Sequence, residues 1–204
     1  MPAILLKVLA LLPWGKILEM ILDKFSNTDK VKDSLEKAQE KIQDRNDWMD
    51  IARREIGQKE IRGRSHNPRI IQYHKSTSLR ASTDEVPWCS SFVNWVVTRA
   101  GYKGTNSAAA RSWLKWGHRI SGPKPGCIVV FWRGKKDGWS GHVGFVTDVD
   151  LSRDKIRVLG GNQADMVKES WYSTDKVLGY RWPESGREAV TMSSSNYDKM
   201  MEGL

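Results

Sequence analysis

A thiol, an imidazole and a carboxamide stand at Cys89, His142 and Asn162. These groups are what acyl transfer through a thioester requires. The thiol attacks, the imidazole takes and returns its proton, and the amide fixes the tautomer of the imidazole. Such partners meet in space rather than along the chain, so their separation in the sequence is no objection. The three residues therefore predict a cysteine nucleophile whose own backbone N–H contributes to an oxyanion hole.

Residues 84–101 indicate a helix that carries Cys89 in its first turn. Pro87 suits an initial helical position, apolar residues recur at helical spacing, and Gly101 suits the position after the helix end. Unpaired N–H groups and the positive end of the helix dipole favour the thiolate over the thiol. The alternative is that Cys89 is a small buried hydrophobic side chain, which is the commoner role of a cysteine taken at random.

The other two groups fall on a predicted β-hairpin. Two apolar runs, 141–149 and 155–162, are separated by a five-residue loop, which is typical of a hairpin. If the hairpin is symmetric about Ser152, His142 lies directly opposite Asn162, with Cβ atoms about 5 Å apart. A bulge at residues 160–161 would shift this register. Further strands are predicted at 127–132 and 177–182.

Ahead of these strands, the sequence indicates helices and an N-terminal extension. Helices are expected near 48–57, from Asn67 onward and over 112–117. We divide the chain into a helical extension over 1–46, a main domain over 47–183 and a poorly ordered tail over 184–204. Residues 1–25 are apolar but interrupted by charges, which indicates an amphipathic helix that docks on a partner, on a membrane face or on its own domain.

Positive charge is concentrated in the main domain. The 204-residue chain has a formal charge of +9, and residues 47–183 hold 23 Lys and Arg against 13 Asp and Glu. Such a field favours an anionic polymer, for which nucleic acid, an acidic membrane surface and the bacterial cell wall are the alternatives. A solvated basic surface without a partner is the simplest alternative. The composition excludes membrane-spanning and disordered classes for the main domain.

The remaining cysteine and histidines give no independent sign of a metal centre. Cys127 heads an apolar strand, which favours a buried structural thiol over a second candidate nucleophile. His66, His74 and His118 lack the spacing of a zinc motif, so no metal or cofactor is expected. Two cysteines do not form a disulfide framework, and two free thiols in a protein made in a reducing compartment are the simpler expectation.

Four segments of the chain, taken in sequence order, resemble the CHAP family, whose members are cysteine- and histidine-dependent amidohydrolases and peptidases. The resemblance to the NlpC-type endopeptidases is more distant. They are Pro-Trp-Cys-Ser-Ser-Phe-Val at Cys89, Pro-Gly-Cys-Ile-Val-Val-Phe at Cys127, Gly-His-Val-Gly-Phe-Val at His142 and Val-Leu-Gly-Gly-Asn-Gln at Asn162. The resemblance implies a papain-like α+β fold, with N-terminal helices packed on an antiparallel sheet. It also implies hydrolysis of amide bonds in the peptidoglycan stem peptide, or between sugar and stem.

The sequence departs from the family pattern at two positions. Cys127 stands where such proteins often have Asp, and Gly160 stands where they often have an acidic residue beside the Asn. The second departure leaves Asn162 as the expected orienting group, with Gln163 or Asp165 as substitutes. Substrate contacts are expected from a further set of residues, namely Trp88, Trp139, Gln163 and Glu85.

The function predicted is that of a metal-independent peptidoglycan peptidase or amidase. The absence of a clear export signal favours a phage lysin, a tail-associated lysin or a delivered antibacterial toxin, which acts on the wall after release or delivery. Residues 1–46 would contact a membrane or a delivery particle, and nucleic acid is not an expected partner. The alternatives are a non-catalytic wall- or nucleic-acid-binding module, and a cysteine acyltransferase or protein-directed protease with the same triad.

Overall fold

The computed structural model describes residues 48–184. The chain divides into residues 1–45 and 46–204, and the description concerns the second unit. The predicted extension over 1–46 and the predicted tail beyond Glu184 lie outside the described residues. Within residues 48–184, no helix has both the length and the apolar character needed to cross a bilayer.

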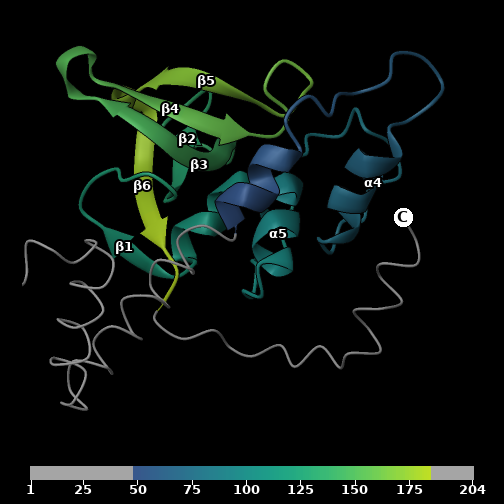
Figure 1. Ribbon diagram of the computed structural model, residues 1–204, viewed down its shortest axis with the longest axis horizontal. Coiled ribbons are helices and arrows are strands. Elements are labelled where there is room, and N and C mark those ends of the chain that lie inside the picture. Colours follow the sequence, from purple (N-terminus) through teal and green to yellow (C-terminus); the bar gives the residue numbers. More distant parts are fainter. Residues whose placement is uncertain (1–47, 185–204) are drawn as a thin grey trace, which may run out of the picture. The chain divides into compact units, whose positions relative to one another are not determined.

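Six antiparallel strands form one sheet in the order β1-β6-β2-β3-β4-β5 (Figure 1). The strands are β1 (His118–Ile120), β2 (Ile128–Trp132), β3 (Gly141–Asp150), β4 (Lys155–Gly160), β5 (Lys168–Ser173) and β6 (Val177–Trp182). The four strands predicted from apolar runs are β2, β3, β4 and β6. The two edge strands, β1 and β5, were not predicted because each pairs on one side only and is built largely from polar residues.

Three α-helical segments of the described chain precede the sheet, and the first of them covers residues 48–54. Helix α4 (Pro68–Lys75) begins after Asn67, whose side chain accepts a hydrogen bond from the backbone N–H of Arg69 at 2.8 Å. Helix α5 (Cys89–Arg99) ends at Arg99 with Ala100 as its C-cap, and Gly101 follows with φ +83°, as the prediction of a glycine after the helix end requires. Pro87 precedes the N-cap residue Trp88, so the prediction that Pro87 lies in the first turn is wrong.

Short 3-10 helices join the remaining elements. They are η1 (Ala110–Lys115), η2 (Leu151–Arg153) and η3 (Thr174–Lys176).

Apolar clusters cover both faces of the sheet. On one face, α5 packs against β3 and β4, and its buried side chains meet Val143, Phe145 and Leu159. The opposite face carries a second cluster, made by Cys127, Val129, Phe131, Val146, Ile156 and Val158. Helices packed on an antiparallel sheet confirm the predicted α+β class. Burial raises the pKa of the Cys127 thiol to about 11, and Cys127 and Cys89 are both free thiols.

The hairpin of β3 and β4 has the predicted register near its open end. Phe145 pairs with Leu159 and Val146 with Val158, and a bulge between Val146 and Asp148 shifts the pairs closer to the turn. The ladder ends at the pair Phe145–Leu159, and β4 ends at Gly160. Asn162 therefore lies outside the sheet with φ +55°, and His142 pairs across with Phe131 of β2 instead. The predicted opposition of His142 and Asn162 is wrong.

Candidate active site

The Cys89 thiol is the first side chain of α5 and is only 6% exposed. Backbone N–H groups of Val143, Ser90 and Cys89 itself act on the sulfur. Burial is the largest influence on the thiol and raises its pKa, while the charge of Arg133 and these three N–H groups act in the opposite direction. The helix start thus lowers the pKa as predicted, but burial outweighs it, and the resting group is a thiol.

The thiol and the imidazole of His142 belong to one site. The backbone N–H that bears on the Cys89 sulfur from the sheet is that of Val143, the residue after His142. The charge of Arg133 acts on both the thiol and the imidazole. The structure therefore brings together the first two members of the predicted triad.

His142 is 1% exposed, and its ring stacks with Phe131 and Tyr172 at centroid distances of 6.3 and 5.5 Å. Burial, followed by the charge of Arg133, lowers the pKa of His142 to about 3, although the hydrogen bond to Gln163 opposes both. The imidazole is therefore neutral near pH 7. Its Nδ1 atom is buried and has no hydrogen-bond partner among the described residues.

Gln163 determines which nitrogen of His142 carries the proton. Its Nε2 atom donates to the carbonyl oxygens of Val158 and Gly160, each at 3.2 Å, and to that of Lys168. These carbonyls fix the amide in one orientation, with Oε1 placed 3.3 Å from His142 Nε2. Because Oε1 only accepts hydrogen bonds, His142 Nε2 carries the proton, and Nδ1 is left with a free lone pair, as a general base requires.

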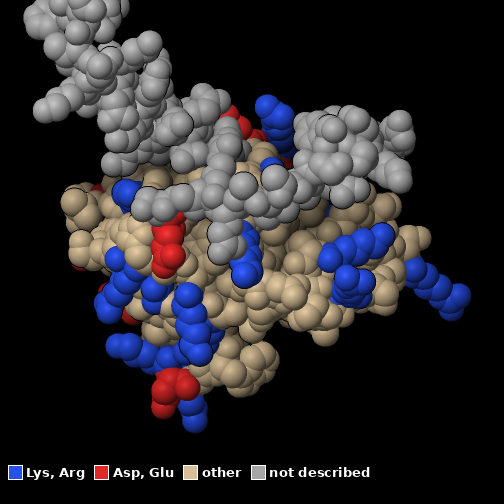
Figure 2. All heavy atoms as spheres, turned by 90° about the horizontal axis from the view of Figure 1, so that it is seen from below, with Lys and Arg blue, Asp and Glu red and all other residues tan. Residues whose placement is uncertain are grey.

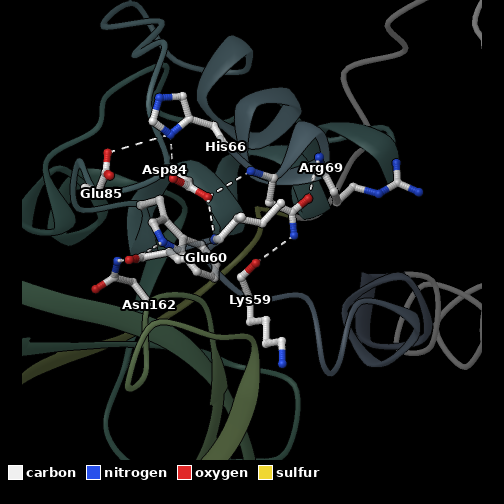
Figure 3. Close-up of polar contacts among 10 residues, drawn as sticks. Lys59, Glu60, His66, Arg69, Asp84, Glu85 and Asn162 are labelled. Carbon is white, nitrogen blue, oxygen red and sulfur yellow. Dashed lines mark hydrogen bonds and ion pairs between the residues drawn. The ribbon is translucent and has the colours of Figure 1, made fainter. Parts of the chain in front are cut away.

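The orienting contact is therefore made by Gln163, which the sequence offered as a substitute, and not by Asn162. The Asn162 Nδ2 atom instead donates to Glu60 Oε1 at 3.0 Å, and the same oxygen accepts from Trp88 Nε1 at 2.8 Å (Figure 3). Glu60 thus joins the residue before Cys89 to the residue before Gln163. Sequence reasoning missed Glu60, because nothing distinguishes it from any other charged loop residue.

The segment that carries Glu60 is attached at both ends. Residues 57–60 follow the segment 165–167 through backbone hydrogen bonds, among them Glu60 N to Asp165 O at 2.9 Å. Beyond Glu60, the completely buried carboxylate of Asp84 accepts from the backbone N–H groups of Ile61 and Asn67 at 2.9 and 2.8 Å (Figure 3). These hydrogen bonds hold the pKa of Asp84 below its usual value against the opposing effect of burial.

His66, Asp84 and Glu85 place three possible metal-ligating atoms within 4.8 Å of one another. His66 Nδ1 lies 2.9 Å from Asp84 Oδ1, and the other Asp84 oxygen accepts the two backbone hydrogen bonds. Protein groups therefore already use both oxygens of the carboxylate, and the cluster is explained as a structural anchor for the loop.

The residues predicted to contact substrate divide into buried and exposed ones. Trp88 is 0% exposed and Gln163 is 3% exposed, so neither offers a surface to a substrate, and both support the site from within. Trp139 is 89% exposed. Glu85 lines a cavity of about 720 Å³ together with Glu60 and Asp165. Contact of Trp139 and Glu85 with the substrate therefore stays a prediction.

A buried thiol at a helix start, beside an imidazole that an amide orients from a neighbouring loop, defines a papain-like cysteine hydrolase site on an α+β fold. Residues 81–162 match the family model of the CHAP domain, a segment that includes Cys89 and His142 and ends one residue before Gln163. This segment of the chain is therefore similar to the CHAP domain, and a CHAP domain implies a cysteine amidohydrolase or peptidase.

Among solved structures, the chain is similar to a Staphylococcus aureus protein described as similar to a lipoprotein of the NLP/P60 family. The identity is 16%, the TM-score is 0.44, and the match covers 71% of this chain and 42% of that one. This chain thus spans less than half the length of that protein. No curated protein sequence matches the chain.

Proposed function

We propose that the protein is a peptidoglycan hydrolase that cleaves amide bonds of the stem peptide, or between sugar and stem, through Cys89, His142 and Gln163. The observation that carries the proposal is the fixed amide of Gln163, which leaves His142 Nδ1 as an unprotonated base with no hydrogen-bond partner among residues 48–184. The CHAP domain supports the enzyme class and the substrate.

In this mechanism the thiol and the imidazole start as a neutral pair. The Cys89 sulfur attacks the carbonyl carbon as its proton passes to His142 Nδ1, and the carbonyl oxygen becomes an oxyanion near the N–H groups at the start of α5. The imidazolium then gives its proton to the leaving amine, the C–N bond breaks, and a thioester remains. Water loses a proton to Nδ1, attacks the thioester and releases the acid and the thiol.

Gln163 stabilises the charged imidazole during these steps. The Gln163 oxygen accepts from His142 Nε2 throughout, and it also accepts from the Tyr172 hydroxyl at 2.6 Å. A neutral amide favours imidazolium less than a carboxylate does. The imidazole therefore gains its proton only as the thiol attacks, because burial opposes a standing positive charge.

The charge of the main domain supports an anionic wall as the setting of the reaction. Lys and Arg side chains outnumber Asp and Glu on the face shown in Figure 2, and residues 47–183 hold 23 basic against 13 acidic side chains. Such a field concentrates the enzyme on a polyanion. Because peptidoglycan lies outside the cytoplasm, we propose that the enzyme acts after release or delivery, as a phage lysin or a delivered toxin does. Residues 1–46 would then be the docking element.

Mass spectrometry of fragments released from purified peptidoglycan tests the proposal. The wild type and Cys127→Ala should release the same stem-peptide fragments, while Cys89→Ala releases none. Cys127 is the matched control because it is the other buried thiol and belongs to a different apolar cluster from Cys89. Wall binding without release by any of the three would indicate a binding module, and acylated amines in place of free acids would indicate an acyltransferase.

A further inference from the structure

The loop between β2 and β3, residues 133–140, is fixed beside the active site. Arg111 of η1 donates to three of its carbonyl oxygens: Nε to Ser140 at 2.8 Å, Nη1 to Lys136 at 2.9 Å and Nη2 to Lys135 at 3.1 Å. The first residue of the loop, Arg133, donates its backbone N–H to Ser140 O at 3.2 Å. The Arg111 side chain therefore holds the middle and the end of the loop, and the backbone hydrogen bond joins its first residue to its last.

Arg133 directly follows β2, and Phe131 of that strand pairs with His142 of β3. The rings of Phe131, His142 and Tyr172 pack against one another. The Arg133 guanidinium forms a hydrogen bond with Tyr172, and its charge acts on the Cys89 thiol and on His142. An exposed cation therefore lies close enough to the nucleophile and the base for its charge to affect the pKa of both.

No carboxylate among residues 48–184 forms an ion pair with Arg133. The other Lys and Arg side chains of the same loop, Lys135 and Lys136, are exposed, and so is Asp137. The loop also presents Trp139, which is 89% exposed and is the most exposed of the large hydrophobic side chains in the described chain. A guanidinium and an uncovered indole on a fixed loop are groups that a substrate can contact.

We propose that Arg133 binds a free carboxylate of the substrate close to the bond that is cut, so that the enzyme selects peptides carrying that carboxylate. This inference rests on the proposed hydrolase function and adds the substrate class. The planar guanidinium presents two parallel N–H donors that match a carboxylate, whereas a carboxamide offers one acceptor and places its own donors against the cation.

The position of Arg133 also links recognition to the chemical step. An unneutralised cation near His142 disfavours the imidazolium that forms when the thiol attacks. A bound carboxylate neutralises that cation at the moment the substrate is in place. A carboxylate-bearing substrate should therefore react with a higher kcat as well as bind with a lower KM.

Two synthetic peptides test the proposal. They share one sequence and one scissile amide and differ only in whether the group next to that bond is a carboxylate or a carboxamide. We expect the wild type to prefer the carboxylate about tenfold to hundredfold in kcat/KM, the range of a hydrogen bond to a charged group. Arg133→Gln should reduce the ratio to near one, Arg133→Lys should keep an intermediate ratio, and Lys135→Gln should keep the wild-type ratio.

The ratio is measured within each variant, so a partial loss of folded enzyme cancels. An unchanged ratio in Arg133→Gln, or no preference in the wild type, would overturn the proposal while leaving the hydrolase function intact. Cleavage of neither peptide by a wild type that also releases nothing from peptidoglycan would overturn the hydrolase function itself. Calorimetry on Cys89→Ala should show the same preference in binding, and its loss in Cys89→Ala with Arg133→Gln.

Discussion

The Oε1 atom of Gln163 accepts hydrogen bonds from two aromatic side chains, His142 Nε2 at 3.3 Å and Tyr172 Oη at 2.6 Å. Both lone pairs of the amide oxygen are used, and the Nε2 end of the amide faces backbone carbonyls. If the amide were turned by 180°, its NH₂ group would face the two donors and its oxygen would face the backbone carbonyls. A buried, fully bonded amide is thus the element that makes His142 Nδ1 a base.

Replacement of Gln163 should therefore impair catalysis more than replacement of Asn162. We expect Gln163→Ala to lower kcat about 100-fold, because the imidazole loses its orientation and its tautomer, while Asn162→Ala lowers kcat much less. Steady-state kinetics on a stem peptide measures both, and ¹⁵N NMR of His142 reports the tautomer directly. A larger loss in Asn162→Ala than in Gln163→Ala would restore Asn162 as the orienting group.

The reactivity of Cys89 toward iodoacetamide should rise with pH without a plateau near neutrality. Alkylation requires the thiolate, and burial raises the pKa of Cys89, so the thiolate fraction grows only as the pH approaches and passes the usual range of a thiol. His142, with a pKa of about 3, is neutral over this range and does not hold a thiolate by charge.

The measurement is made in a Cys127→Ala background, so that Cys89 is the one thiol that reacts. Arg133→Gln should move the profile to higher pH, since the cation lowers the pKa of the thiol. A rate that is already constant between pH 5 and 7 would show a standing thiolate–imidazolium pair and contradict the neutral starting state.

Glu60 should act on the site through the two residues that it holds. Glu60→Ala removes the acceptor of Trp88 and Asn162, and we expect it to cost about 1–3 kcal/mol in the free energy of unfolding and to lower kcat. Glu60→Gln keeps one oxygen acceptor and removes the repulsion from Asp165, Asp84 and Glu85, which with burial raises the pKa of Glu60. It should retain most of the wild-type activity.

Urea unfolding and peptide kinetics on the same samples separate the two effects. Asp165→Asn is the matched control, because Asp165 is an exposed carboxylate of the same cavity that bonds neither Trp88 nor Asn162. Equal losses in Glu60→Ala and Asp165→Asn would show that the charge of the cavity matters and not the link between the two loops.

The sequence was sufficient to place Cys89 at the start of a helix and to give the register of the hairpin at Phe145 and Val146, because both follow from local periodicity. The helix start and Gly101 are each indicated by a few neighbouring residues, and the pair Phe145–Leu159 follows from the symmetry of the turn. The edge strand β5 was missed because its six residues, Lys-Glu-Ser-Trp-Tyr-Ser, do not alternate between apolar and polar.

The choice between Asn162 and Gln163 required the path of a single loop. After Gly160 the chain leaves the sheet, and Asn162, Ala164 and Asp165 adopt left-handed φ values of 55°, 52° and 62°. None of the three is a glycine, and although Asn and Asp tolerate left-handed φ values, their presence does not say at which residue the loop turns. A difference of one position in this loop decides whether the Asn162 or the Gln163 amide faces the imidazole. The alternation of side chains in a strand does not continue into the loop, so the sequence pattern cannot decide between them.

Gly161 is required because the nucleophile helix and the orienting loop touch there. A Cβ atom on Gly161 would lie 2.5 Å from the Trp88 ring and 2.7 Å from Phe92 Cβ, and both side chains are 0% exposed and cannot move aside. Gly161→Ala should cost about 1–3 kcal/mol by overpacking and should lower kcat, since Trp88 directly precedes Cys89.

Gly122→Ala provides the matched control, because a Cβ there meets nothing within 4 Å. We expect it to change the free energy of unfolding by less than about 1 kcal/mol and to leave kcat unchanged. Thermal unfolding and peptide kinetics are measured on both variants. Equal stability and equal kcat in Gly161→Ala and Gly122→Ala would contradict the close approach at Gly161. If Gly161→Ala is destabilised but retains full kcat, the contact supports the fold without positioning the thiol.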